Sequence, residues 1–270
     1  MLASVHIYPL KGCRAVDLEE AVVEPWGLAG DRRWMLVDAD GQFLTQREHP
    51  ALARLVVTYA QGADIIVSGD GYPSLRVAAP GDLPGLLKVT VWRSTVLAAA
   101  AGPEADAWFS GYLGRPARLV WLDDPTRRGV NPEYGRDGDV VSFADGYPLL
   151  LTTAGSLDRF GEWLSEAGEQ PVPMNRFRPN VVVSGYEPWA EDRWRRIRIG
   201  AVSFRVVKPC ARCVVTTTDQ ATGERGRQPL RMLARHRRFG KNLIFGQNLI
   251  PDSPGLIRVG DPTAIIEYAS

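Results

Sequence analysis

The sequence is poor in the residues that build disulfide frameworks, zinc centres and hydrolytic triads. Among its 270 residues it has only three cysteines and three histidines. A small secreted domain held together by disulfides needs more cysteines than this, at regular spacing. Zinc hydrolases need clustered histidines, and serine hydrolases need a histidine beside the nucleophile. We therefore expect a protein of the reducing cytoplasm and disfavour both hydrolase classes.

The sequence also lacks a large net charge and long apolar runs. Thirty-two Lys and Arg residues stand against 31 Asp and Glu residues, so the formal net charge is +1. That balance offers no general attraction to nucleic acid or to an anionic membrane surface. The longest weakly polar stretch, residues 83–101, is interrupted by Lys88 and Arg93. We expect no signal peptide and no membrane-spanning helix, and neither nucleic acid nor a membrane as a partner.

Glycine and proline, by contrast, are plentiful and divide the chain into short β-branched runs. The 27 glycines and 20 prolines recur between such runs at intervals of roughly ten residues, which is typical of all-β domains. Segments 38–41 and 68–71 each end in a glycine that can adopt positive φ, which predicts hairpin turns. The predicted strands are residues 34–37, 55–59, 65–68, 89–92, 117–122, 180–184, 196–199, 202–207, 213–217, 256–259 and 264–267.

Helix signals are few and occur in three places. Residues 153–168 have a threonine cap, apolar residues at helical spacing and a stop glycine. Residues 103–113 begin with a proline at the first helical position, and residues 229–235 form a shorter third candidate. A turn-rich segment after the second of these marks a boundary. The pattern predicts a mainly β (α+β) fold in two domains, residues 1–115 and 116–270.

The densest chemical signal is the pair Cys210 and Cys213, which follows a predicted strand. Half of a zinc site needs a second pair of ligands, and none stands in a tight group elsewhere in the sequence. A redox dithiol should open a helix, whereas residues 214–218 are predicted to continue as strand. Two readings stay open: buried structural cysteines, or a thiolate that binds a transition metal with Arg212 nearby to stabilise its charge.

Basic residues occur in three turn-rich loops far apart in the sequence. The loops are residues 8–14, 30–34 and 175–180. A single arginine is usually a solvated surface residue. Several arginines and lysines in such loops, in a chain whose net charge is close to zero, favour a small anionic ligand. Guanidinium groups match the geometry of phosphate oxygens. Asn180 and Gln247 can add amide contacts to a heterocycle, and no Gly-rich nucleotide motif is present.

Seven sequence blocks occur in an order that is characteristic of one known family. The first two are residues 7–14 and 30–38. The other five are residues 143–151, 177–185, 210–219, 245–247 and 259–262. Together they resemble the MOSC proteins, which are named for the C-terminal domain of molybdenum-cofactor sulfurase. The likeness covers nearly the whole chain and is strongest to the branch of the mitochondrial amidoxime-reducing component and its bacterial relatives.

The resemblance implies a fold, a cofactor and a set of site residues. It implies an N-terminal β-barrel domain at 1–115 and a MOSC β-barrel domain with a few helices at 116–270. It implies the molybdenum cofactor, a molybdopterin with one pterin dithiolene, with Cys213 as the metal ligand and catalytic residue. The cofactor-binding positions are Lys11, Arg32, Asp145, Arg178, Asn180, Arg212 and Gln247. Many members have a serine after the lysine of the first block, where this chain has Gly12.

The resemblance also implies a reaction and its partners. It implies a molybdenum-dependent oxidoreductase that reduces N-hydroxylated compounds such as amidoximes and hydroxylamines. Because no cysteine-rich iron–sulfur segment and no flavin or nicotinamide motif is present, the electrons are expected from a separate ferredoxin-type or flavoprotein donor. Neither a membrane anchor nor a fused ferredoxin domain is expected. The alternatives are a non-catalytic carrier of sulfur or of the cofactor, and a β-rich binding module with a structural cysteine pair.

Overall fold

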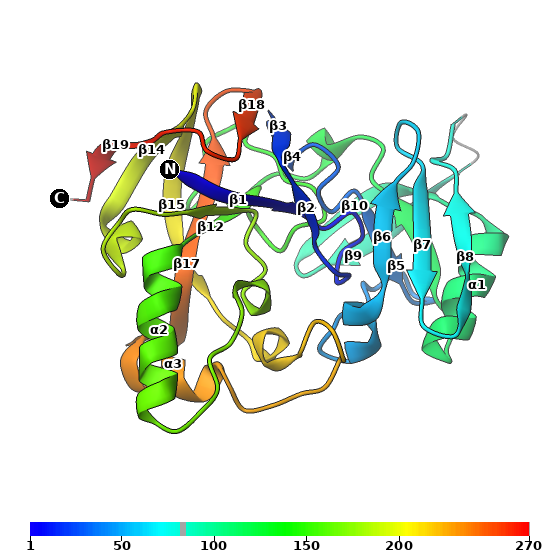
Figure 1. Cartoon of the computed structure of the whole chain (residues 1–270). Coiled ribbons are helices and arrows are strands. Elements are labelled where there is room, and N and C mark those ends of the chain that lie inside the picture. The colour runs from blue at the N-terminus through cyan, green and yellow to red at the C-terminus, as the bar shows by residue number, and fades with distance from the viewer. Residues whose placement is uncertain (82–84, 270) are drawn as a thin grey trace.

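Short β-strands build two lobes that lie side by side in the computed structural model (Figure 1). The structure describes residues 1–81 and 85–269. The larger lobe holds a nine-stranded sheet and two of the helices, and the smaller lobe holds two antiparallel sheets and one helix. The predicted mainly β (α+β) class is confirmed.

The nine-stranded sheet forms the frame of the larger lobe. Its only parallel pair is β12 with β13, within the described part of the chain. The spatial order is β19 (Thr263–Tyr268), β14 (Trp194–Ile199), β15 (Val202–Ala211), β17 (Asn242–Pro251), β12 (Leu149–Thr153), β13 (Val181–Val183), β1 (Leu2–Ile7) and β2 (Val16–Leu18), with β16 (Arg238–Phe239) paired to β17. A three-stranded sheet faces it, made of β18 (Gly255–Arg258), β3 (Glu20–Glu24) and β4 (Gly27–Leu28).

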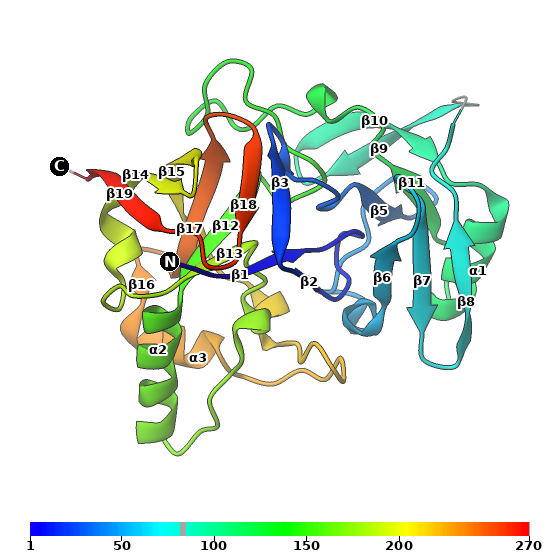
Figure 2. The same ribbon diagram turned by 45° about the horizontal axis from the view of Figure 1, so that its top comes forward.

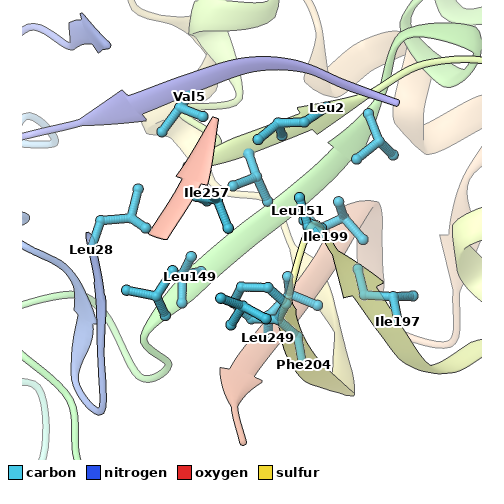
Figure 3. Close-up of a cluster of buried hydrophobic side chains, with 14 of the residues drawn as sticks. Leu2, Val5, Leu28, Leu149, Leu151, Ile197, Ile199, Phe204, Leu249 and Ile257 are labelled. Atoms are coloured by element: carbon cyan, nitrogen blue, oxygen red, sulfur yellow. The ribbon is translucent and has the colours of Figure 1, made fainter. Parts of the chain in front are cut away.

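The core of the larger lobe lies between these two sheets (Figure 3). Leu151 of β12, Phe204 of β15 and Ile257 of β18 are fully buried there. All five residues of β12 are buried, which suits a strand in the interior of a sheet. Burial of this apolar surface supplies most of the stabilisation of the lobe.

The smaller lobe packs two sheets against one helix. One sheet has the order β5 (Trp34–Val37), β11 (Arg118–Trp121), β10 (Ser94–Ala100) and β9 (Leu86–Val91), and the other has the order β6 (Val56–Tyr59), β7 (Ile65–Gly69) and β8 (Tyr72–Val77). Helix α1 (Pro103–Leu113) buries Phe109 against them. The predicted hairpin at 68–71 joins β7 to β8, and the turn at 38–41 is closed by a hydrogen bond from Asp38 N to Gln42 O.

Two helices cover the larger lobe near its lower end (Figures 1 and 2). Helix α2 (Ala154–Glu166) begins at Thr153, whose side chain accepts a hydrogen bond from Ser156 N, so the predicted cap is confirmed. Helix α3 (Leu230–His236) buries Met232 and Leu233. None of the helices in the described ranges is both long and apolar enough to cross a membrane.

Strands from the two halves of the sequence share sheets. β1 to β4 come from the first 28 residues but pair within the larger lobe, and β11 follows residue 116 but pairs within the smaller one. Figure 2 shows β3 beside β18. Because strands from each half of the sequence pair in the other lobe, the sheets do not test the predicted domain boundary between residues 115 and 116. That boundary stays a prediction.

One predicted strand is wrong. Residues 213–217 do not extend a sheet, because Val214–Thr217 form a 3-10 helix, η5, with Cys213 at its N-cap. The hydroxyl of Thr216 donates to Cys213 O at 2.9 Å, and that of Thr217 donates to Val214 O at 2.8 Å. These local bonds outweigh the strand preference of β-branched residues, because threonine side chains compete for backbone groups. β15 instead runs longer than predicted, to Ala211.

Candidate functional site

A cleft between the two lobes collects most of the residues that the sequence singled out. Its volume is about 940 Å³, part of it open to solvent. The smaller lobe and the N-terminal loops contribute one wall, and the larger lobe contributes the other. The predicted site residues that line it are Lys11, Arg32, Asp145, Arg178, Asn180, Arg212 and Cys213. Gly12 lines it as well with φ +92°, so a serine at this position would be strained.

Cys213 lies where β15 ends and η5 begins. Arg212 N donates to Leu243 O, which anchors the end of the strand. The carbonyl of Cys213 accepts from both the amide and the hydroxyl of Thr216. The thiol is half-buried and faces the cleft. Arg47 donates from Nη2 to its sulfur at 3.4 Å.

Cys210 shares the cleft, and Arg212 contacts it rather than Cys213. Arg212 Nη1 lies 2.8 Å from Cys210 Sγ, and Nη2 donates to Phe177 O at 2.6 Å. The third cysteine, Cys13, is fully buried, and burial raises the pKa of its thiol well above the usual range. It therefore stays protonated and inert.

Lys11 and Asp145 form an ion pair in the lining of the same cleft. Lys11 Nζ lies 2.5 Å from Asp145 Oδ1 and donates to Phe143 O at 2.8 Å. Burial lowers the pKa of Lys11 to about 8, although Asp145 acts in the other direction. Burial opposes ionisation of Asp145, but Lys11 and the indole of Trp92 outweigh it and hold the pKa of that carboxyl well below its usual range.

Two arginines enclose the ring of Tyr8. Their guanidinium carbons lie 4.3 Å (Arg32) and 4.2 Å (Arg178) from the ring centroid. Arg32 donates to Asp31 at 2.5 Å, whereas Arg178 donates to two neutral oxygens, Cys13 O and Gln220 Oε1. Burial, together with the nearby charge of Arg32, lowers the pKa of Arg178. The charge of Arg178 is therefore not neutralised by any carboxylate hydrogen bond in the described chain.

Backbone strain is concentrated at this cleft. In the described ranges, four non-glycine residues have positive φ. Three of them, Arg32 (49°), Trp92 (57°) and Arg178 (55°), line the cleft. Left-handed backbone at bulky residues costs energy and clusters at functional sites, where the surrounding structure enforces it. This strain singles out the cleft independently of its side-chain chemistry.

The two predicted amide contacts have different positions. Asn180 lines the cleft, but its Oδ1 accepts from Leu150 N and from Arg32, and its Nδ2 donates to His6 O. It therefore orients Arg32. Gln247 is buried outside the cleft lining and donates to Asp192 Oδ1 at 2.8 Å. The geometry gives no support to Gln247 as a direct contact to a ligand in the cleft, and its predicted role stays untested.

Comparison with known proteins assigns the chain to a family. Residues 1–116 match the MOSC N-terminal beta barrel domain, and residues 138–264 match the MOSC domain. A mitochondrial amidoxime-reducing component 1 of Xenopus laevis is 31% identical over 97% of this chain and 81% of its own length. The chain belongs to the MOSC family. The human protein of the same name is 30% identical over 98% and 82%, and a molybdenum cofactor sulfurase of Oryza sativa subsp. japonica is 30% identical over 91% of this chain but 32% of its own length.

The donor set of this MOSC cleft fits a ligand that carries both a soft metal and an anionic group. Cys213 offers one accessible sulfur, the ligand type that soft metals prefer. Among the described residues, no group of three His, Cys, Asp or Glu side chains could hold a metal by itself, so a metal at Cys213 needs further ligands from the molecule that carries it. The cations Lys11, Arg32, Arg47, Arg178 and Arg212 outnumber the carboxylate of Asp145 in the cleft lining. That excess favours an anion such as a phosphate.

Sequence reasoning missed two residues of the MOSC cleft, Arg47 and Trp92. Arg47 stacks over the Trp92 ring at 4.3 Å and contacts Cys213, and Trp92 donates to Asp145 at 3.1 Å. Trp92 stood at the end of a predicted strand and Arg47 in an unassigned loop. Neither had a local signal beyond its residue type, because the smaller lobe brings them to the cleft.

Proposed function

We propose that this MOSC protein binds the molybdenum cofactor and reduces N-hydroxylated compounds such as amidoximes and hydroxylamines. The observation that carries the proposal is an accessible thiol, Cys213, in a cleft whose lining has excess positive charge. The relatives named amidoxime-reducing components support the reaction class. A separate ferredoxin-type or flavoprotein donor would supply the electrons. On cysteine content alone, we keep the cytoplasm as the proposed compartment.

The cleft residues divide into those that would hold the metal and those that would hold the anionic end of the cofactor. Cys213 would hold the molybdenum, and Lys11 and Arg178 would contact the phosphate. When bound, the cofactor supplies a redox metal that can remove the oxygen atom of an N–O bond. The overall reaction consumes two electrons and two protons and releases the amine or amidine and water.

The remaining cleft residues would position and stabilise these groups. The guanidinium of Arg47 donates to the sulfur of Cys213 and would stabilise negative charge there. Asp145 accepts from both Lys11 and Trp92, and so orients one cation and one aromatic ring at the cleft. Trp92 is 41% exposed, and the part of its ring that Arg47 does not cover offers an apolar surface against which a substrate can pack.

Metal analysis of protein from a host that makes the cofactor tests the proposal. We expect about one molybdenum per chain, and reduction of a model amidoxime by a reduced viologen dye. The same preparation should not oxidise NADH until a flavoprotein donor, or a ferredoxin-type donor together with its NADH-dependent reductase, is added. Protein that carries no molybdenum and reduces no amidoxime would overturn the proposal.

A sulfur or cofactor carrier is the second candidate. It is favoured by the presence of two thiols in one cleft, with Arg212 against Cys210. The carrier hypothesis predicts a persulfide on a cysteine of the cleft, or bound cofactor without reduction of a substrate. Mass spectrometry of the native protein and the dye-driven assay separate the two functions.

A further inference from the structure

A strongly basic stretch of the chain surrounds helix α3. Between residues 224 and 241 there are seven of the 32 Lys and Arg residues but only one of the 31 Asp and Glu residues. The rest of the chain therefore carries a net negative charge. Six of these cations are exposed. One of them, Arg225, donates to the carbonyls of Gln46 and Arg47. The other five define what we call the α3 surface: Arg227, Arg231, Arg235, Arg238 and Lys241.

Acidic side chains of the chain neutralise little of the charge of these five cations. In the described residues, the single salt bridge that any of them makes joins Arg231 to Glu169 at 3.8 Å, a long contact between half-exposed side chains. Arg231 and Arg235 are four residues apart on α3, so they lie on one face of the helix. Like charges held together on a surface repel each other, so a binding partner of opposite charge relieves the repulsion.

An exposed aromatic ring lies within the α3 surface. Phe239 of β16 is 54% exposed, with Arg237 at 5.0 Å from its centroid. The hairpin of β16 and β17 that carries it begins where α3 ends. Aromatic residues ringed by charged groups are typical of protein interfaces, where the ring supplies buried area and the charges steer the approach.

One layer of side chains separates the α3 surface from the cleft. Met232 and Leu233 of α3 pack in the same buried cluster as Phe177 and Phe245. The two phenylalanine rings are stacked with centroids 3.7 Å apart, and Phe177 lines the cleft and accepts from Arg212. Figure 1 shows α3 against the lower end of β17. A protein bound at α3 thus sits directly behind the wall that carries Cys210 and Cys213.

We propose that the α3 surface is the docking site for an acidic redox protein that delivers electrons to the cleft. This inference rests on the proposed function, because it needs a redox centre in the cleft. Its partner is a small protein whose own redox group is surrounded by carboxylates. Opposite charges accelerate such encounters, which suits a transient complex for electron transfer.

Charge reversal at α3 tests the proposal against a matched change elsewhere. The test variant is Arg231→Glu with Arg235→Glu. The control is Arg195→Glu with Arg198→Glu, two exposed arginines of β14 outside the cleft lining. With an acidic plant-type [2Fe–2S] ferredoxin as the probe, we expect the α3 variant of the full chain to bind roughly tenfold or more weakly at low salt. The β14 variant should bind within about twofold of the parent chain.

The readouts keep this proposal separate from the proposed function. Calorimetric binding of ferredoxin needs no turnover, so it can succeed even if the chain reduces no amidoxime. In loaded protein, the α3 variant should lose ferredoxin-driven reduction and keep viologen-driven reduction. The matched pair Arg231→Gln with Arg235→Gln should give an intermediate loss, and thermal melting of each variant checks folding.

Three results would overturn the docking proposal. The first is equal weakening by the α3 and β14 variants. The second is unchanged ferredoxin binding in the α3 variant. The third is α3-dependent binding to vesicles of phosphatidylcholine with phosphatidylserine and no binding to ferredoxin, which would mean that the surface meets a membrane.

Discussion

Arg47 and Asp145 show how single residues set the electrostatics of the cleft. Arg47 comes from a loop of the smaller lobe and contacts the sulfur of Cys213, a residue of the larger lobe. Asp145 is the counter-ion of Lys11. Because burial lowers the pKa of Lys11 to about 8, the charge of this lysine changes close to neutral pH.

The first prediction concerns Lys11 and pH. Its ammonium is charged below about pH 8 and becomes neutral above it, so affinity for an anion should fall as pH rises through this value. Calorimetric titration of the cofactor-free chain with inorganic phosphate should show this loss between about pH 7 and about pH 9.5. Lys11→Met should bind more weakly and without that step. Lys88→Met, at an exposed position outside the cleft, should behave as the parent chain. A step that persists in Lys11→Met would contradict the assignment.

The second prediction distinguishes the two cysteines of the cleft. Cys213→Ala should lose bound molybdenum and dye-driven activity, because the soft ligand is gone. Cys210→Ala should keep most of the metal, because that sulfur serves as an acceptor for Arg212. Molybdenum content by mass spectrometry is the measurement. Equal loss in both variants would show that the two thiols share the role.

At the scale of elements, the junction of β15 and η5 decides where Cys213 lies. Local pattern alone predicts strand over residues 213–217, yet two threonine hydroxyls close a 3-10 turn. Arg176 then donates to the carbonyls of Thr216 and Thr217 and holds the turn from another segment. Predicted elements with strong local signals, such as β5 and α1, have the predicted bounds.

The third prediction tests this turn. Thr216→Val and Thr217→Val keep the shape of the side chain but remove its hydrogen bond, and both residues are buried. Each should lower the free energy of unfolding by about 0.5–1.5 kcal/mol, measured by urea denaturation. The serine variants, which keep the hydroxyl, serve as controls and should retain more molybdenum than the valine variants. Valine variants as stable as the parent chain, with full metal content, would show that the hydroxyl bonds do not hold the turn.

At the scale of the whole molecule, the cleft depends on both lobes. Gln46 of the smaller lobe and Gln220 of the larger one exchange amide hydrogen bonds at 3.2 and 3.3 Å. Arg178 also contacts Gln220, and through Cys13 O it reaches the N-terminal loop. A ligand in the cleft would therefore connect segments that are distant in sequence.

The fourth prediction follows from that arrangement. A ligand that binds only the folded chain stabilises it by mass action, by about 2.7 kcal/mol when its free concentration is 100 times Kd. Cofactor-loaded protein should therefore melt several degrees higher than cofactor-free protein. Cys213→Ala should lose most of this difference. Identical melting curves of loaded and cofactor-free protein would argue against a site shared by the two lobes.

The sequence by itself determined the mainly β class, the turns, the first helix and the presence of a soft-ligand pair with basic loops. Those features depend on a few adjacent residues, whose propensities and spacing act locally. The tertiary structure alone decided that Arg47 and Trp92 reach the cleft, that Arg212 contacts Cys210, and that Gln247 lies outside the lining. The direction of a long side chain depends on strand pairing between distant segments. The residues next to it in the sequence do not indicate that pairing.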